Sequence, residues 1–407
     1  MGKFIVIVLD SFGVGFMEDV PRVRPQDTGA NTALHIFEKV KGLKLSGLEK
    51  LGLMNTLDYE TDIMKKNPQA VWGRSALMHF NADTFYGHQE IMGTKPRHPV
   101  MEPFSKSIEA VSNKLIQKGH SVSFIGKGNL RVLLVDGCVT VGDNLEADGG
   151  QAYNVTATFD KIPFEKEAEI ARIVRDEVHV SRVIVFGGRN VPVEKIIGAY
   201  EIKDGIYAGI NAPGSGVYDE GYFVQHLGYG IDSRVQIPSL LGKKGIKTVL
   251  IGKVADIVEN PFGESIPGVD TAYVMEKTIE KAMEMENGFI CTNVQETDLA
   301  GHKEDSFLYA DRLSVADKYI SRLMPLLNPQ DIMVVMADHG NDPTIGHSHH
   351  TRENVPILIY KKGVQNIFIG DRKTLSDIGM TVADYFETEK PENGESFLKL
   401  LSKKEEC

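Results

Sequence analysis

The highest density of reactive side chains in this sequence lies in the segment ADHGNDPTIGHSHHTRE, residues 337–353, which holds four of the chain's twelve histidines. Its first two residues are the last two of the apolar run DIMVVMAD (331–338). Asp338 and His339 offer a hard oxygen and an imidazole, a combination suited to Zn or Mn. The glycines and the Asn-Asp-Pro turn let the backbone bend back, so a later histidine can reach the same place. The alternative is a solvated loop with incidental histidines, but the position after a strand favours a metal site.

Two further pieces carry acidic residues and histidine. Asp298 and His302 are four residues apart in DLAGH, so one helical turn points both the same way. By itself this spacing is more typical of a cap or a turn. Asp10 ends the apolar run FIVIVLD, where a lone aspartate is more often a helix N-cap than a ligand.

A candidate nucleophile lies in NADTFYGHQEIMG, residues 81–93. Thr84 follows Asp83 and precedes a glycine turn, which suits an exposed hydroxyl. A threonine hydroxyl needs activation, and a metal that lowers its pKa is the available means. The competing interpretation is that Asp83 and Thr84 only cap the helix that follows.

These side chains need elements that bring them together. Apolar runs rich in Val and Ile alternate with amphipathic stretches, which indicates an α/β protein with a mainly parallel sheet flanked by helices. In such sheets functional groups gather at the carboxyl ends of the strands, so Asp10 and Asp338 can converge. The expected strands are 4–10, 121–126, 181–188, 247–252, 288–294 and 331–338, all buried on both faces, and the expected helices are 165–177, 271–286 and 306–327.

The middle of the chain has a different character, with its own strands, helices and glycine-rich loops such as NAPGSG (211–216). We interpret residues 99–228 as a smaller α/β domain inserted between the two parts of the core, 1–98 and 229–407. Its position in the chain suggests a cap over the site.

The bulk composition excludes several classes. The 407 residues are 42% hydrophobic and carry a net charge of −11, which argues against a nucleic-acid partner. Three widely spaced cysteines allow no disulfide framework. No apolar run approaches the ~20 residues of a membrane span, and the N-terminal run is too short for a signal peptide. We expect a cytoplasmic protein that binds a small molecule.

Together these motifs resemble the alkaline phosphatase superfamily and, within it, the phosphopentomutases. The resemblance covers about 1–95 and 230–407 and rests on VLDSFGVG, D83-TFYGHQEIMG93, GKVADI (252–257), ADHGNDP and HHTRENVPIL. It implies an alkaline-phosphatase-like core with two divalent metal ions, manganese being the family's preference and zinc being admitted by the donors. It also implies a phosphomutase that moves a phosphoryl group on a sugar phosphate through phosphothreonine.

Carried over by position, the resemblance predicts two metal sites. In phosphopentomutases a metal-binding histidine directly precedes Thr-Arg-Glu, and His350 holds that position in this chain. His347 and His349 are the alternatives for the same ligand. The nucleophile-side site is predicted to hold Asp10, Thr84, Asp338 and His339, and the second site Asp298, His302 and His350.

The sequence departs from the phosphopentomutases in two places. The spacing of Asp298 and His302 is one residue shorter and is similar to that of cofactor-independent phosphoglycerate mutases. The insertion lacks the arginine-rich stretch with which the family binds the distal phosphate. Arg189 or Arg234 could serve in its place, but glycine and tyrosine are poor replacements for it. We therefore expect ribose 5-phosphate to be a poor substrate. A phosphatase or phosphodiesterase on the same scaffold remains the main alternative, ahead of a non-catalytic binding module.

Overall fold

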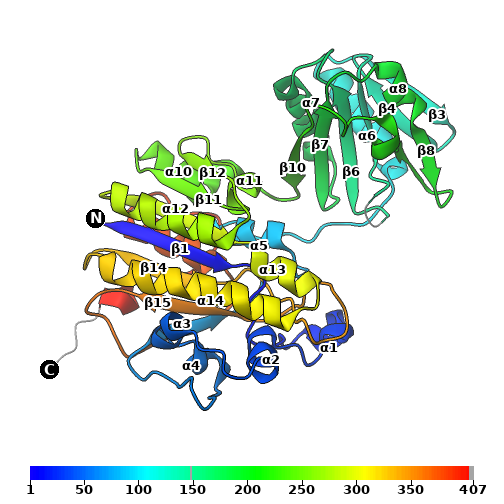
Figure 1. Ribbon diagram of the computed structural model, residues 1–407. Coiled ribbons are helices and arrows are strands. Elements are labelled where there is room, and N and C mark those ends of the chain that lie inside the picture. Colours follow the sequence, from blue (N-terminus) through cyan, green and yellow to red (C-terminus); the bar gives the residue numbers. More distant parts are fainter. Residues whose placement is uncertain (147–148, 403–407) are drawn as a thin grey trace. The chain divides into compact units, whose positions relative to one another are not determined.

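The computed structural model describes residues 1–146 and 149–402, which form two compact units (Figure 1). The first unit combines Met1–Pro96 with Asp232–Cys407, and the second is the segment Arg97–Ile231 inserted between them. The second unit is slightly wider at both ends than the insertion expected from the sequence.

The first unit is built on one large sheet in which a single strand runs against the others. The strand order is β12-β11-β13-β1-β14-β15-β2-β16. Only β15 is antiparallel to its neighbours, β14 and β2, so the expected α/β fold with a mainly parallel sheet is confirmed. The strands are β1 (Lys3–Leu9), β2 (Val71–Ser75), β11 (Thr248–Ile251), β12 (Glu264–Ile266), β13 (Gly288–Val294), β14 (Ile332–Met336), β15 (Val355–Tyr360) and β16 (Ile367–Arg372).

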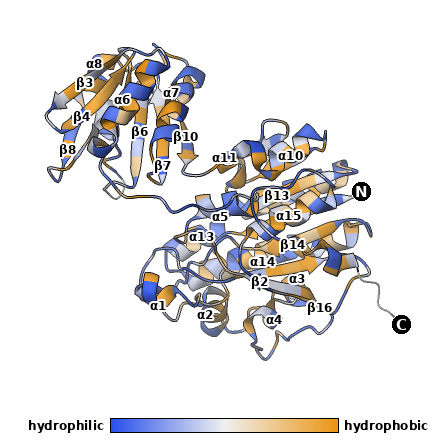
Figure 2. Cartoon of the chain, turned by 180° about the vertical axis from the view of Figure 1, so that it is seen from behind, coloured by the Kyte–Doolittle hydropathy of each residue, from blue (hydrophilic) through white to orange (hydrophobic). Residues whose placement is uncertain are grey.

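Helices cover both faces of this sheet. α12 (Thr271–Glu284), α14 (Ser306–Leu323) and α3 (Ser46–Leu51) pack in a row on one face, while α15 (Ser376–Tyr385) contacts α5 (Thr84–Ile91) and α10 (Ile237–Lys243) on the other (Figures 1 and 2). Side-chain caps fix several helix starts: Asp305 accepts from two backbone N–H groups of α14, and Asp270 from one of α12. The remaining helices are α1 (Val20–Val23), α2 (Thr32–Lys39), α4 (Leu53–Leu57), α11 (Val254–Ile257) and α13 (Glu296–His302).

The central strands lie in the middle of the sheet because they are composed mainly of apolar residues. Every residue of β1, β13 and β14 is buried, as expected for strands covered on both faces. Figure 2 shows the hydrophobic colour running along β13 and β14. Burying one aliphatic side chain contributes about 1.5–3 kcal/mol, so these runs hold the sheet in one register.

The second unit contains a six-stranded sheet in the order β10-β7-β6-β5-β4-β3 and a two-stranded sheet of β8 and β9. Only β6 and β7 pair in parallel, joined by the crossover helix α7. The strands are β3 (Val122–Lys127), β4 (Leu130–Val135), β5 (Val139–Asp143), β6 (Ala152–Thr158), β7 (Arg182–Gly188), β8 (Tyr200–Lys203), β9 (Tyr207–Ile210) and β10 (Phe223–Gly228). The helices are α6 (Ile108–Gln117), α7 (Phe164–Glu177), α8 (Val193–Gly198) and α9 (Ala212–Ser215).

One expectation about burial is wrong. The run 121–126 does form a strand, but β3 lies at the edge of its sheet and has no buried residue. Apolar residues in a short run therefore do not distinguish an edge strand from a central one. Among the described residues, no helix combines the length and apolar character needed to cross a bilayer.

Candidate active site

The predicted ligands converge at the carboxyl edge of the first unit's sheet. β1 lies between β13 and β14, with Leu9 level with Val294 and Val8 level with Met336. Asp10 therefore leaves the sheet beside the start of α13 and beside the turn that carries Asp338. Strand order and register alone explain why residues more than three hundred positions apart meet here.

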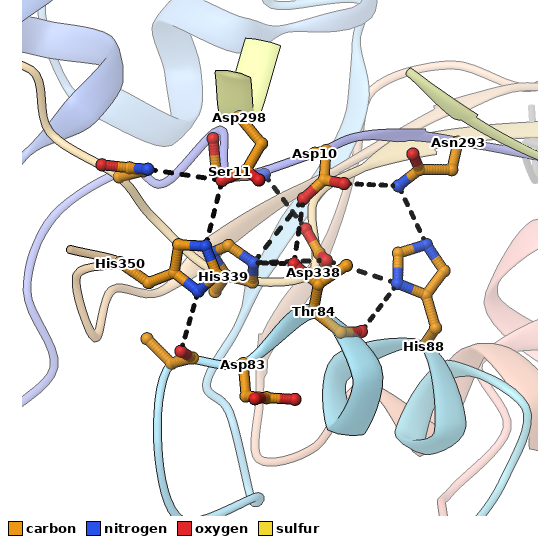
Figure 3. Close-up of polar contacts among 12 residues, drawn as sticks. Asp10, Ser11, Asp83, Thr84, His88, Asn293, Asp298, Asp338, His339 and His350 are labelled. Atoms are coloured by element: carbon orange, nitrogen blue, oxygen red, sulfur yellow. Dashed lines mark hydrogen bonds and ion pairs between the residues drawn. The ribbon is translucent and has the colours of Figure 1, made fainter. Parts of the chain in front are cut away.

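The first group of potential ligands consists of Asp10, Asp338 and His339, all completely buried, with ligand atoms lying close enough to hold one metal ion. His339 Nε2 lies 3.6 Å from Asp10 Oδ1 and 3.5 Å from Asp338 Oδ2. The backbone N–H of Ser11 donates to Asp338 Oδ1 over 3.0 Å and fixes that carboxylate. Figure 3 shows these side chains pointing toward one another.

The second group forms around Asp298. His350 Nε2 lies 3.1 Å from Asp298 Oδ1, and His302 Nε2 lies 3.4 Å from Asp298 Oδ2. Asp298 and His302 occupy the same face of α13, as their spacing predicts. His339 is also within metal-sharing reach of Asp298 and His350, so it stands between the two groups. The structure thus brings together every ligand residue that the sequence singled out.

Of the three histidines considered for the last position, His350 faces this cluster. Its Nδ1 donates to the carbonyl of Ala82 over 3.0 Å, and Arg24 donates to the His350 carbonyl over 2.9 Å. His347 instead lies 3.3 Å from Asp27. His349 pairs its backbone N–H with the His347 ring. The neighbouring histidines therefore shape the loop that carries His350.

Thr84 is the hydroxyl that faces the clustered ligands. It is the first residue of α5, and Asp83 caps that helix by accepting from the Tyr86 backbone N–H. The Thr84 Oγ1 lies 2.7 Å from His339 Nε2 and 3.4 Å from Asp10 Oδ1, with only 5% of the residue exposed. The capping role that competed with the nucleophile thus belongs to Asp83, and the Thr84 side chain is left for the cluster.

Three residues in the site were given no role from the sequence. Lys253 Nζ lies 3.2 Å from Thr84 Oγ1, 3.4 Å from Asp10 Oδ2 and 3.6 Å from Asp298 Oδ2. Asn293 donates to Asp10 Oδ2 over 3.0 Å, and His88 Nδ1 lies 3.3 Å from Asp338 Oδ2. Lys253 stands just past the end of β11, and Asn293 near the end of β13. Both lie near the carboxyl end of a strand, where functional groups gather, and this is the sequence signal that could have identified them.

The electrostatics reflect crowded carboxylates. Burial, together with the charge of Asp338 and against the opposing effect of Lys253, raises the pKa of Asp10 to about 7. Burial also lowers the pKa of His339 to about 4, which keeps its imidazole neutral. Burial lowers the pKa of Lys253, but Asp10 and its neighbours more than offset this and hold the ammonium charged.

The donor set fits divalent cations. The Nδ1 atoms of His302, His339 and His350 each lie 2.7–3.0 Å from a backbone carbonyl, which can only accept a hydrogen bond. Each Nε2 is therefore left with a lone pair toward the cluster, the form in which histidine binds metals. In addition, Asp338 Oδ2 is buried and accepts no hydrogen bond from the described residues. A mixed set of carboxylates and imidazoles suits Mn or Zn.

Comparisons with known proteins match the chain to a metalloenzyme family and to proteins named phosphopentomutase. A family model described as the metalloenzyme superfamily matches residues 2–390. A phosphopentomutase from Alkaliphilus metalliredigens is 28% identical, over 98% of this chain and 99% of that protein. One from Alkaliphilus oremlandii is 29% identical, over 98% of both. The solved structure of a phosphoglycerate mutase from Leishmania mexicana is 10% identical over 97% of each chain, with a TM-score of 0.44.

The resemblance to phosphopentomutases that the motifs predicted is therefore confirmed along nearly the whole chain, including the inserted unit. The similarities support an enzyme of the phosphomutase type, and the ligand groups suggest divalent metals. With its family model spanning residues 2–390, the chain belongs to the metalloenzyme superfamily.

Proposed function

We propose that this protein is a manganese-dependent phosphomutase that moves a phosphoryl group between two positions of one sugar phosphate, with Thr84 as the phosphoryl acceptor. The observation that carries the proposal is the place of the Thr84 hydroxyl. Its oxygen lies 3.2 Å from Lys253 Nζ and 2.7 Å from Nε2 of His339, the residue that the two ligand groups share.

The proposed reaction begins with the transfer of the phosphoryl group to Thr84. The oxygen of the Thr84 hydroxyl attacks phosphorus, and an O–P bond forms while the bond from phosphorus to the sugar oxygen breaks. In balance, the proton that Thr84 loses is gained by this departing sugar oxygen. The reverse attack by a second hydroxyl of the same sugar then restores Thr84. Two divalent ions, with Asp10, Asp338 and His339 around one and Asp298, His302 and His350 around the other, would neutralise the phosphoryl oxygens.

Lys253 has a separate part in this scheme. Its ammonium stays charged beside the carboxylates, and it approaches the nucleophile without belonging to either ligand group. A fixed cation at this position stabilises the negative charge that develops on the transferring phosphoryl group.

A mutase must also keep water from phosphothreonine, and we assign this task to the inserted unit. The insertion carries Tyr218 and Tyr222 in the region where the arginine-rich stretch of phosphopentomutases was expected. This composition supports a substrate other than ribose 5-phosphate. It also keeps a phosphatase on the same scaffold as the second candidate.

One assay separates these functions. The manganese-loaded protein is incubated with a panel of sugar phosphates that includes ribose 5-phosphate, and isomerised ester and free phosphate are measured separately. The proposal expects isomer to exceed free phosphate for one member of the panel and slow turnover of ribose 5-phosphate. Free phosphate as the main product from every ester would establish a phosphatase instead. Efficient isomerisation of ribose 5-phosphate would refute the substrate part alone.

A further inference from the structure

The second unit contains a cavity that the proposed reaction does not use. It has a volume of about 550 Å³, within the range of small-molecule sites, and includes Phe159, Phe164, Arg189 and Phe223. Phe159 directly follows β6 and Arg189 directly follows β7, so the cavity lies at the carboxyl ends of the unit's parallel strand pair. In a strand-helix-strand unit this edge is where ligands bind.

The position of this cavity within the unit separates it from the chain connections. The incoming chain pairs Val100 with Val180, and the outgoing chain bonds Tyr229 to Ser181, both at the beginning of β7. The cavity lies at the other end of the same strand, beyond Gly188. A seven-residue strand spans roughly 23 Å, so the connections do not take part in the cavity.

Three phenylalanine rings form the apolar part of the cavity. Phe164 packs edge to face against Phe223, with ring centroids 4.5 Å apart and planes at 81°. Phe159 packs against Phe164 with centroids 6.0 Å apart. Phe223 nevertheless remains 55% exposed, although its ring packs against Phe164. An exposed ring backed by rigid neighbours is a platform on which a flat aromatic group can stack.

Two cations line the cavity beside these rings. In the part of the chain that the structure describes, neither the Arg189 guanidinium nor the Lys161 ammonium makes a hydrogen bond or an ion pair. The backbone of Gly221 lies directly against the stem of Arg189: a Cβ at this position, where φ is +61°, would lie 2.8 Å from Arg189 Cγ. A guanidinium and an ammonium that line the same cavity can together bind a phosphate group.

The rim also carries the carboxylates of Asp160 and Glu165. Carboxylates repel a ligand that is only an anion, but they accept hydrogen bonds from sugar hydroxyls. The cavity therefore combines a ring platform, hydroxyl acceptors and a phosphate receptor. We propose that it binds a nucleoside monophosphate, with the base against Phe223 and the phosphate at Arg189 and Lys161.

The test is a calorimetric titration of the full chain with AMP, carried out with a chelator so that metal-bound phosphate does not contribute. The double variant Lys161→Ala with Arg189→Ala should weaken AMP binding by about tenfold or more, because charged hydrogen bonds to phosphate are lost. Phe223→Ala should weaken AMP similarly and leave ribose 5-phosphate unaffected, since that ligand has no base. Arg172→Ala removes an exposed cation from the same helix as Phe164 and should change nothing.

Each result decides the matter. AMP binding that survives unchanged in the double variant would overturn the proposal, and its loss in Asp338→Asn would then place the nucleotide at the metal ligands. The absence of binding to the unmodified chain at millimolar AMP would also overturn the proposal. Loss in the double variant, retention in Asp338→Asn and a base-specific effect of Phe223→Ala would establish the site. Because the titration measures binding without metal, its failure would leave the proposed mutase activity untouched.

Discussion

The two units bury acidic side chains in opposite ways. In the first unit Asp10, Asp298 and Asp338 lie together among imidazoles and the Lys253 ammonium. In the second unit Glu167 is completely buried on α7, and neither of its carboxylate oxygens has a hydrogen-bond partner among the described residues. Burial alone raises the pKa of Glu167 to about 9, so this side chain is a neutral acid at pH 7.

This difference in surroundings decides whether a buried carboxyl group can bind a cation. In the first unit the neighbouring histidines lower the pKa of Asp298 and Asp338, whereas burial raises that of Asp10. A divalent cation bound there would favour the ionised form of all three. The second unit offers Glu167 no compensating charge, so its proton remains. A buried acid is therefore not by itself a sign of a metal site; its partners decide.

The largest effect is expected from removing charge in the first unit. Asp338→Asn keeps the shape of the side chain but lowers the affinity for the ion beside Thr84. Because that ion supplies several kcal/mol of transition-state stabilisation, kcat should fall about 10³-fold or more. Metal content by mass spectrometry and turnover measure both effects. Asp371→Asn, an exposed acid paired with Arg74 away from the site, is the control. Unchanged metal content in Asp338→Asn would contradict the ligand assignment.

A second prediction concerns Lys253, which brings a positive charge to the buried carboxylates of the first unit without being a metal ligand. Lys253→Met should lower kcat about 10²-fold, the size of effect seen when one stabilising group at a transition state is removed. Metal content should stay near that of the unmodified protein. Lys362→Met changes an exposed lysine and should be neutral. If Lys253→Met loses its metal, Lys253 holds the site together and does not act on the phosphoryl group.

The smallest effect concerns stability in the second unit. The folded-state pKa of Glu167, about 9, exceeds its ordinary value of 4.5, so the folded chain keeps a proton that the unfolded chain releases. Stability is therefore lost as pH rises from about 4.5 to 9. Glu167→Gln removes this loss and should stabilise the unit by roughly 2–4 kcal/mol at pH 8, with little change at pH 4.

Amide hydrogen exchange within residues 97–231 at the two pH values measures this difference. Glu169→Gln, on the exposed side of the same helix, provides the matched control and should show no such pH dependence. Equal protection of Glu167→Gln and the unmodified chain at pH 8 would show that Glu167 has a partner in solution.

The sequence predicts much of the first unit because its strands are apolar throughout and end in reactive residues. FIVIVLD, GFICTNV and DIMVVMAD became β1, β13 and β14, and their adjacency explains the site. β15 and β2 were not predicted, since a proline and polar residues interrupt their apolar patterns. The order of strands in a sheet is set by long-range packing, which no local pattern records.

Some contacts in the site could not be predicted from the sequence, because they depend on how distant segments pack. His339 follows Asp338 directly, yet its ring reaches both ligand groups, because the turn after β14 points its Nε2 between them. The contact between Lys253 and Thr84 joins residues 169 positions apart, and the side-chain conformation that makes it depends on three carboxylates from other elements. Such convergence follows only once the strand order is known.

Thr84 is the residue on which the account depends most, and its modification is the most direct test. The manganese-loaded protein is incubated with a phosphorylated substrate, digested and examined by peptide mass spectrometry. We predict phosphate on Thr84, its absence together with loss of turnover in Thr84→Val, and its persistence in Ser11→Ala, whose hydroxyl is bonded to Tyr309 at 2.9 Å instead of facing the ligands. Phosphate on another residue, or full turnover by Thr84→Val, would contradict the proposed mechanism.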